Sequence, residues 1–232
     1  MENFILSDLV VRNAIPHDID FIIETIIEAD KSGTSISSTC NILNILEKEY
    51  RTILRDILTE NVEGQEFSLS GFLVAELHKE PIGALGSWVE GAIGVSSYLL
   101  YSNILLHYMD REKIPFILAN FKITKELSFR REDGSLQFEY GYVKKEFRRS
   151  GVYTRIMIES LKKHYFLNNT IPKVQGICFK ANYPSLNAAK KLGFKEIESK
   201  KSQNEELKKI FPYNERVLLE MDNHTINEVV NL

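Results

Sequence analysis

One stretch of the chain decides its fold: Tyr142-Val143-Lys144-Lys145-Glu146-Phe147-Arg148-Arg149-Ser150-Gly151-Val152-Tyr153. It joins a β-rich run over 136–143 to a helical pattern that Gly151 opens and that ends at about His164. Such a strand-to-helix turn points several free backbone N–H groups at one spot, beside the positive end of the helix dipole. The stretch therefore predicts an anion site suited to a phosphate or pyrophosphate.

The charge around this turn differs from that of the whole chain. The segment from Lys144 to Lys163 contains seven basic and two acidic residues, which gives it a local net charge of +5. The full 232 residues carry 29 Lys+Arg against 32 Asp+Glu, a net charge of −3. The basic patch is therefore local, and the global balance gives no reason to expect nucleic acid or an anionic membrane as a partner. Taken alone, the patch is also compatible with plain solvated surface.

Strands and helices alternate on both sides of the turn. Upstream we expect a strand over 9–14, helices over 19–27 and 37–60, and a hairpin of strands 72–77 and 82–89 with a Pro-containing turn. Two further helices are expected over 92–109 and 114–127. Downstream we expect a strand over 173–179, a short helix over 184–192 and a strand over 194–198. A polar loop or exposed helical turn over 199–209 and a last strand over 216–221 follow. This order indicates one α/β domain over residues 1–232, in which helices pack on a mixed sheet.

Composition excludes several classes of protein. With 44% hydrophobic and 26% charged residues, the chain has ordinary globular usage. Its two cysteines, Cys40 and Cys178, have no Cys or His partner at metal-ligand spacing, so we expect neither a disulfide framework nor a metal site. The amino terminus lacks the regions of a signal peptide, and no apolar run approaches the ~18 residues of a spanning helix. We therefore expect a cytoplasmic protein without a membrane partner.

A second motif begins 31 residues after Gly151: Asn182-Tyr183-Pro184-Ser185-Leu186-Asn187-Ala188-Ala189-Lys190-Lys191-Leu192-Gly193-Phe194. Together the two segments resemble the GNAT N-acetyltransferases, whose signatures are Arg/Gln-x-x-Gly-x-Gly/Ala and an Asn followed by a short helix and Leu-Gly-Phe. The resemblance extends to Val11-Arg12-Asn13-Ala14 with Asp18, similar to the family's first strand and turn, and to the hairpin at 72–89. It covers most of the chain except roughly 91–135.

The resemblance implies a mixed, mostly antiparallel GNAT-like sheet, flanked by helices, whose fourth and fifth strands splay apart. Here those strands are 136–143 and 173–179. The segment 91–135 then becomes a helical insertion between the third and fourth strands. Its apolar content is too high for disorder, so we expect it to pack on the domain. It either walls the amine pocket at the acceptor end of the sheet, which we favour, or makes a dimer contact on an outer face.

The family holds acetyl-CoA in the gap between the splayed strands, with its pyrophosphate on the turn and its pantetheine arm along the fourth strand. The resemblance implies that the pyrophosphate is bound by Arg148, Arg149, Ser150, Gly151, Val152 and Tyr153. It implies that the pantetheine arm is bound by Tyr142, Val143 and Asn182. Lys144, Lys145 or Arg155 could meet the 3′-phosphate on electrostatic grounds alone.

The sequence departs from the family pattern at two positions. Tyr153 stands where the second Gly/Ala is expected, so its side chain must swing away from the phosphates or cover them. Ala189 stands where many members carry a tyrosine that acts as general acid for the departing thiolate. The role of general acid is therefore unassigned, although a thiolate is stable enough to leave without one.

Direct attack of an amine on a thioester needs a group that takes up the amine proton. Glu139 lies on the fourth strand, at the expected parity of Gln137, Gly141 and Val143, and some family members place a carboxylate base on that strand. A glutamate inside an apolar strand is costly unless it is solvated, paired or functional. We take Glu139 as the catalytic base, and a solvated or lysine-paired Glu139 as the alternative.

Other side chains near the expected gap have weaker claims. Cys178 is interpreted as a packed small residue and not a nucleophile, because no histidine at a recognisable spacing could activate it. Tyr183 could replace the missing acid, but a packing role is favoured. His17 and Glu90 fall near the acceptor end of the sheet, and spacing gives neither a role.

These observations favour an enzyme that moves an acetyl group from acetyl-CoA, its co-substrate, to a primary amine on a small molecule or peptide. We expect no metal, no covalent intermediate, and a monomer or homodimer. The alternative is an acyl-CoA-binding sensor with weak or no catalysis, which Tyr153 and Ala189 make arguable. A phosphate-binding domain independent of acyl-CoA would require the splayed strands to be absent.

Overall fold

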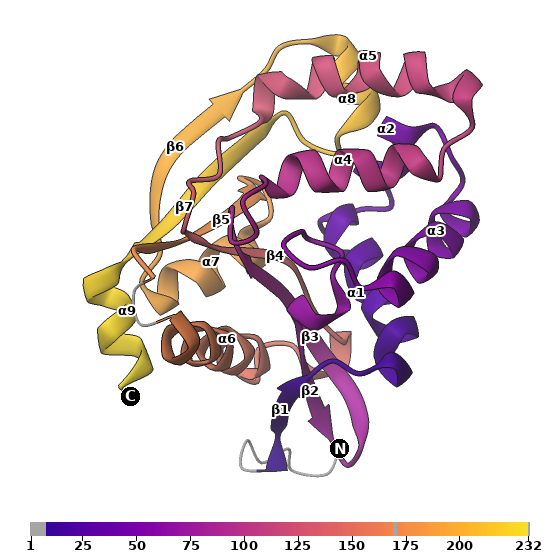
Figure 1. Cartoon of the computed structure of the whole chain (residues 1–232). Coiled ribbons are helices and arrows are strands. Elements are labelled where there is room, and N and C mark those ends of the chain that lie inside the picture. Colours follow the sequence, from indigo (N-terminus) through magenta and orange to yellow (C-terminus); the bar gives the residue numbers. More distant parts are fainter. Residues whose placement is uncertain (1–7, 169–170, 232) are drawn as a thin grey trace.

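Seven strands form one sheet in the computed structural model, which describes residues 8–168 and 171–231 (Figure 1). Their order is β1-β2-β3-β4-β5-β7-β6, and all neighbours are antiparallel except β4 and β5. The strands are β1 (Val10–Asn13), β2 (Phe72–Leu77), β3 (Glu80–Val89), β4 (Leu136–Val143), β5 (Lys173–Phe179), β6 (Lys195–Lys201) and β7 (Glu215–Asp222). The predicted strands and the mixed, mostly antiparallel sheet are confirmed.

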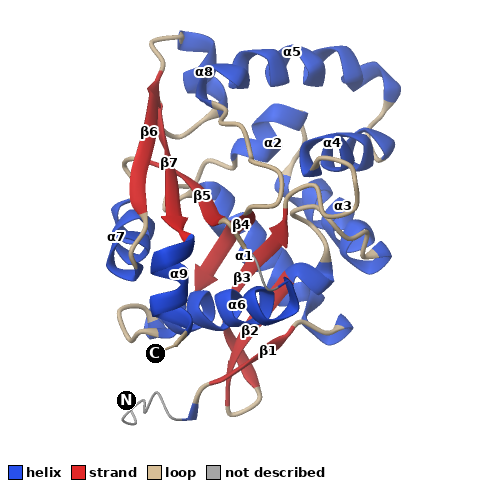
Figure 2. Ribbon diagram, turned by 60° about the vertical axis from the view of Figure 1, so that its left-hand side comes forward, coloured by secondary structure: helices blue, strands red, loops and turns tan. Residues whose placement is uncertain are grey.

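Helices cover both faces of this sheet (Figures 1 and 2). On one side, here the α1 face, lie α1 (Ile19–Lys31), α2 (Ser38–Leu43), α3 (Glu47–Glu60), α4 (Ser97–His107), α5 (Ile114–Thr124) and α8 (Glu205–Ile210), with α1 directly against the strands. The other, here the α6 face, packs against α6 (Val152–Asn168), α7 (Tyr183–Leu192) and α9 (Asn223–Val230). Each face has its own buried apolar core, so the sheet separates two layers of helices.

β4 and β5 part along their length. They pair only where Leu136, Gln137 and Phe138 meet Val174, Gln175 and Gly176. Across this edge, residues 139–143 and 177–179 have no strand partner in the described part of the chain. We call this opening the β4–β5 gap. It is the predicted splay of the fourth and fifth strands.

A β-bulge in β4 changes the direction of its side chains. The pairing with β3 shifts at Tyr140, whose φ is +54°. Tyr140 packs with the core of the α1 face, whereas Gly141 and Val143 face α6. The expected shared parity of Glu139 with Gly141 and Val143 is therefore wrong, because the bulge inserts one residue between them.

The segment 91–135 forms the predicted helical insertion and lies on the α1 face. Tyr101 of α4 meets Phe67 edge-on, with ring centroids 5.2 Å apart. Asn120 of α5 donates a hydrogen bond to the carbonyl of Ile42 in α2, at 3.0 Å. Pro115 falls in the first turn of α5, where its missing N–H leaves no helical bond unmade. The insertion is thus tied to both the loop before β2 and the second helix.

Several local expectations differ from the structure. The helix expected over 37–60 is broken into α2 and α3, because Asn44 adopts a left-handed φ of 52° and ends the first. The hairpin turn consists of His78 and Lys79, both with positive φ, and Pro81 lies within β3. The polar stretch 199–209, expected to be a loop or an exposed helical turn, contains the end of β6 and all but the last residue of α8.

At the carboxyl end, α9 follows the last expected strand, and Asp222 caps it by accepting the N–H of Thr225. Among residues 8–168 and 171–231, no helix has both the length and the apolar character needed to cross a membrane.

Candidate functional site

The turn between β4 and α6 carries backbone N–H groups that no group in the described part of the chain accepts. Residues Lys145–Phe147 form a 3-10 turn, and the 17-residue helix α6 begins at Val152. Arg149 and Gly151 have positive φ values of 66° and 89°. Within residues 8–168 and 171–231, no group accepts a hydrogen bond from the backbone N–H groups of 149–153. These groups and the helix dipole together favour a bound anion, as the sequence predicts.

Arg148 closes this turn onto the end of β4. Its Nε donates a hydrogen bond to the carbonyl of Val143 at 3.0 Å. Its Cζ lies 5.6 Å from the ring centroid of Tyr142. The carbonyl of Val143, one of the groups expected to hold the pantetheine arm, is therefore already engaged by a side chain of the protein.

The ring of Tyr153 lies in the β4–β5 gap on the α6 face. A β-carbon added to Gly141 would stand 2.8 Å from Cζ of Tyr153, and closer still to its Cε2 and Oη. Burial raises the pKa of Tyr153 to about 12, and the nearby side chain of Ser185 in α7 opposes this rise. Tyr153 thus points away from the turn and extends from β4 to α7, across the path expected for the pantetheine arm.

Four other residues around the gap have defined environments. Burial raises the pKa of the Cys178 thiol to about 11, which fits a packed neutral thiol. Asn182 caps α7, and its side chain accepts the N–H of Ser185 at 3.4 Å. Tyr183 is 66% exposed, so the packing role favoured for it is wrong. Ala189 is buried in the core of the α6 face.

On the α1 face, one arginine joins two carboxylates. Nη1 of Arg131 lies 3.1 Å from Oε2 of Glu66, and its Nη2 forms an ion pair with Oε2 of Glu139. Its Cζ lies 4.8 Å from the ring centroid of Trp88. The side chain of Glu139 is 19% exposed and that of Glu66 is 5% exposed. Glu139 is therefore neither a freely solvated carboxylate nor one paired with a lysine.

Glu90 connects Arg131, Glu66 and Glu139, here called the Arg131 cluster, to the insertion. Ser97 Oγ donates to Oε2 of Glu90 at 2.6 Å and accepts from Nη1 of Arg131 at 2.9 Å. Trp88 Nε1 also donates to Glu90 Oε2, at 3.2 Å. A residue that spacing left without a role thus fixes the start of α4 beside Arg131. His17, named with it, is exposed at the surface.

Glu66 was not found from the sequence. It lies in the loop between α3 and β2, where no helical or strand periodicity marks a residue as inward-facing. Burial raises the pKa of Glu66 above its ordinary range, the charge of Glu139 raises it further, and Arg131 opposes both. A carboxylate whose pKa moves towards neutrality suits proton uptake. Glu66 therefore stands beside Glu139 as a second candidate base.

The turn 149–153 and the carboxylates paired with Arg131 lie beside the same strand, β4, on opposite faces of the sheet. The turn 149–153 and the Tyr153 ring lie on the α6 face, and the Arg131 cluster lies on the α1 face. Glu139 and Gly141 of β4 flank Tyr140, the bulge residue that separates their directions. The gap beside β4 is therefore the place where a group held by the turn and a group held by the carboxylates can meet.

Comparison with known proteins identifies this arrangement. No family model and no curated protein matches the sequence. An N-acetyltransferase from Staphylococcus aureus Mu50 superimposes with a TM-score of 0.63 at 15% identity, over 91% of this chain and 100% of that chain. A ribosomal-protein-alanine N-acetyltransferase from Brucella melitensis gives 0.52 at 13% identity, over 92% and 99%. The chain has the GNAT fold.

The GNAT fold alone does not define an acceptor. A chimera of the Vibrio cholerae spermidine N-acetyltransferase SpeG also superimposes, with a TM-score of 0.54 at 12% identity, over 97% of this chain and 99% of that chain. It and the Brucella protein are named for different amines. The activity of this chain must therefore be argued from its own residues.

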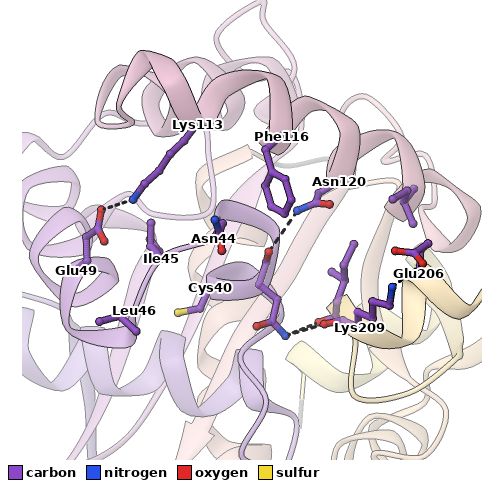
Figure 3. Close-up of a pocket in the computed structure, with 13 residues that line it drawn as sticks. Cys40, Asn44, Ile45, Leu46, Glu49, Lys113, Phe116, Asn120, Glu206 and Lys209 are labelled. Atoms are coloured by element: carbon purple, nitrogen blue, oxygen red, sulfur yellow. Dashed lines mark hydrogen bonds and ion pairs between the residues drawn. The ribbon is translucent and has the colours of Figure 1, made fainter.

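An open groove of ≈ 680 Å³ is a second hollow of the molecule (Figure 3). It runs between α2, α5 and α8 and is lined by residues that include Cys40, Phe116 and Lys209. None of the residues predicted to bind acetyl-CoA or to take up the amine proton lines it. The groove is therefore separate from the candidate site.

Proposed function

We propose that the chain is an N-acetyltransferase that moves an acetyl group from acetyl-CoA to a primary amine by direct attack. The observation that carries the proposal is the β4–β5 gap, with unpaired N–H groups on one face and paired carboxylates on the other. The N–H groups suit the pyrophosphate of an acyl carrier. The carboxylates suit an amine that must lose a proton. Acetyl-CoA would supply the activated thioester.

The turn is proposed to bind the pyrophosphate through the N–H groups of residues 149–153. Their lack of acceptors within the described chain and the left-handed backbone at Gly151 support this role. Lys144, Lys145 or Arg155 would meet the 3′-phosphate, an assignment that rests on charge alone. Asn182 and the backbone of Tyr142 would contact the pantetheine arm.

Glu139 is proposed to take up the amine proton, directly or through one water molecule. Its greater exposure makes it more accessible than Glu66 to an incoming amine. The ion pair with Arg131 fixes the carboxylate against β4, and Ser97 fixes the arginine in turn. Oriented bases of this kind contribute because the proton acceptor is already placed when the amine arrives.

Tyr153 and Ala189 keep the rival proposal open, a sensor that binds acyl-CoA without catalysis. The Tyr153 ring occupies the gap, and Ala189 offers no acid for the thiolate. For transfer to occur, the ring must swing out as the pantetheine arm enters. Thiol release separates the two proposals, since a sensor binds acetyl-CoA and releases no thiol with any amine.

Calorimetry and a thiol-release assay over a panel of amines test the proposal. Gly151→Glu places bulk and negative charge at the phosphate site and should abolish acetyl-CoA binding. Gly94→Glu is the matched control, because Gly94 is also exposed and left-handed, with a φ of 78°, but lies in the insertion. Unchanged affinity in a folded Gly151→Glu protein would remove the basis for the assignment of acetyl-CoA to this turn.

A further inference from the structure

Arg216 on the α1 face has no ion-pair partner among the residues that the structure describes. Arg216 is the second residue of β7 and pairs in register with Phe179, the last residue of β5. Within residues 8–168 and 171–231, no group forms an ion pair with its guanidinium or accepts a hydrogen bond from it, and its Nε is buried. Its Cζ lies 5.4 Å from the ring centroid of Phe179 and 5.7 Å from that of Phe211. In the described part of the chain, the guanidinium therefore contacts aromatic rings and no hydrogen-bond acceptor.

Nearby carboxylates do not satisfy this arginine. The charges of Asp30 and Arg216 affect one another, and Glu139 likewise raises the pKa of Arg216. Asp30, however, accepts hydrogen bonds from Ser37 and Thr39, and Glu139 is paired with Arg131. Both acids are thus committed to other donors, and neither contacts Arg216.

A guanidinium in this state is costly to the fold. Burial lowers the pKa of Arg216, because the charged form loses hydration that no acceptor replaces. Contact with two aromatic rings offsets part of this loss. An uncompensated buried donor is an exception to the usual satisfaction of polar groups, and such exceptions concentrate at sites that a ligand completes.

Arg216 lies beside the β4–β5 gap. Phe179, against which it stacks, belongs to the part of β5 that has no partner in β4. Glu139, whose charge raises the pKa of Arg216, belongs to the unpaired part of β4. The guanidinium is thus on the same face as the proposed base and opposite the turn 149–153.

We propose that Arg216 binds a carboxylate that one of the two substrates carries into the gap. This inference rests on the proposed acyl transfer. Two parallel N–H groups of a guanidinium match a carboxylate, and the rings of Phe179 and Phe211 fix the plane of the fork. The carboxylate belongs either to the acceptor, which Glu139 and Arg216 would hold by its two ends, or to the far end of a longer acyl group.

The test compares matched substrates with and without the carboxylate, by thiol release. Amino acids are paired with their amides as acceptors for acetyl-CoA, and succinyl-CoA is paired with acetyl-CoA as the donor for one amine. The wild-type protein should prefer the carboxylate by about tenfold or more in one pair, and that pair identifies its source. Arg216→Met should abolish the preference, and Arg216→Lys should retain part of it, since lysine keeps the charge without the fork.

Arg111→Met is the control, because Arg111 is an exposed arginine between α4 and α5, and it should leave the preference unchanged. No carboxylate preference in either pair would overturn the proposal. The same holds if a folded Arg216→Met protein, verified by circular dichroism, keeps the wild-type preference.

Failure of the proposed acyl transfer is distinguished by binding. If no pair releases thiol, calorimetry is done with N-acetylated amino acids against their amides, and with succinyl-CoA against acetyl-CoA. A carboxylate preference that disappears in Arg216→Met supports the site without any transfer activity. Equal binding of both members of each pair overturns it.

Discussion

The ring of Tyr153 in α6 lies against Gly141 of β4, at the point where β4 and β5 part. Two departures from regular structure produce this contact. The bulge at Tyr140 turns Gly141 towards α6, and the absence of a side chain at Gly141 leaves room for the ring. The gap that a pantetheine arm would need is thus filled by a side chain of the protein, whose rotation would open it.

Tyr153→Ala should bind acetyl-CoA about tenfold more tightly than the wild-type protein. The variant need not displace the ring from its position against Gly141, and a gain of ~1.4 kcal/mol corresponds to a factor of ten. Calorimetry measures the change. Tyr183→Ala is the control, since Tyr183 is exposed and should leave affinity unchanged. Weaker binding by Tyr153→Ala would mean that the ring holds the ligand and does not obstruct it.

Gly141→Ala should lower stability by roughly 1–3 kcal/mol, because the added methyl overlaps the Tyr153 ring. The double variant Gly141→Ala/Tyr153→Ala should recover part of this loss, with a coupling of about 0.5–3 kcal/mol. Denaturant unfolding of all four proteins measures it. Additive effects of the two substitutions would show that the ring and Gly141 are not in contact in solution.

Glu139→Gln should lower turnover by ~10²-fold or more at neutral pH and leave acetyl-CoA affinity nearly intact, as loss of a general base does. Glu66→Gln is the matched variant on the same arginine and should cost less than about tenfold, because Glu66 is the less accessible acid. Steady-state kinetics with a verified acceptor decides between them. The reverse pattern would assign the base to Glu66.

Local sequence signals predict the position of some residues of the candidate site and not of others. The turn at Gly151 was predictable, because a strand end, a glycine and a helix start are local signals. The direction of Glu139 was not, because it depends on a bulge that forms only when β3 and β4 pair. Arg131 and Glu66 lie in loops, where no periodicity indicates that a charged side chain turns inward.

The break between α2 and α3 has a similar origin. Apolar residues continue at helical spacing past Asn44, so periodicity alone predicts one helix. The left-handed backbone of Asn44 ends α2 and redirects the chain. Asn120 of α5 then bonds the carbonyl of Ile42 near that break, a contact across 78 residues that no local pattern could show.

His164 should make stability depend on pH. It is 9% exposed, and burial, with the charge of Lys163, lowers its pKa from 6.5 to about 4. Between these values the unfolded chain binds a proton that the folded chain does not, so stability falls as the pH is lowered from 6.5 to 4. The loss from this group is about 3 kcal/mol. The free energy of unfolding of His164→Gln, measured over the same range, should fall less steeply; an identical slope would contradict the assignment.

Replacing residues 95–130 by a short Gly/Ser loop should spare acetyl-CoA binding and remove acceptor turnover. Binding is spared because the turn 149–153 lies on the α6 face, whereas α4 and α5 lie on the α1 face. Turnover is lost because Ser97 and Tyr101 of α4 border the Arg131 cluster, so their removal opens it to water. Thiol release and calorimetry give the two readouts, and circular dichroism checks the fold.

The insertion also exposes apolar side chains, including Leu99 and Phe116. The alternative to a pocket wall is therefore that the insertion contacts a second copy of the chain. The double substitution Leu99→Ser/Phe116→Ser separates these roles, because it alters the outer surface and keeps Ser97 and Tyr101. If the insertion walls the pocket, this variant should turn over acceptor like the wild-type protein. A shortened protein that keeps full acceptor turnover but becomes monomeric in sedimentation would instead assign the insertion to an interface.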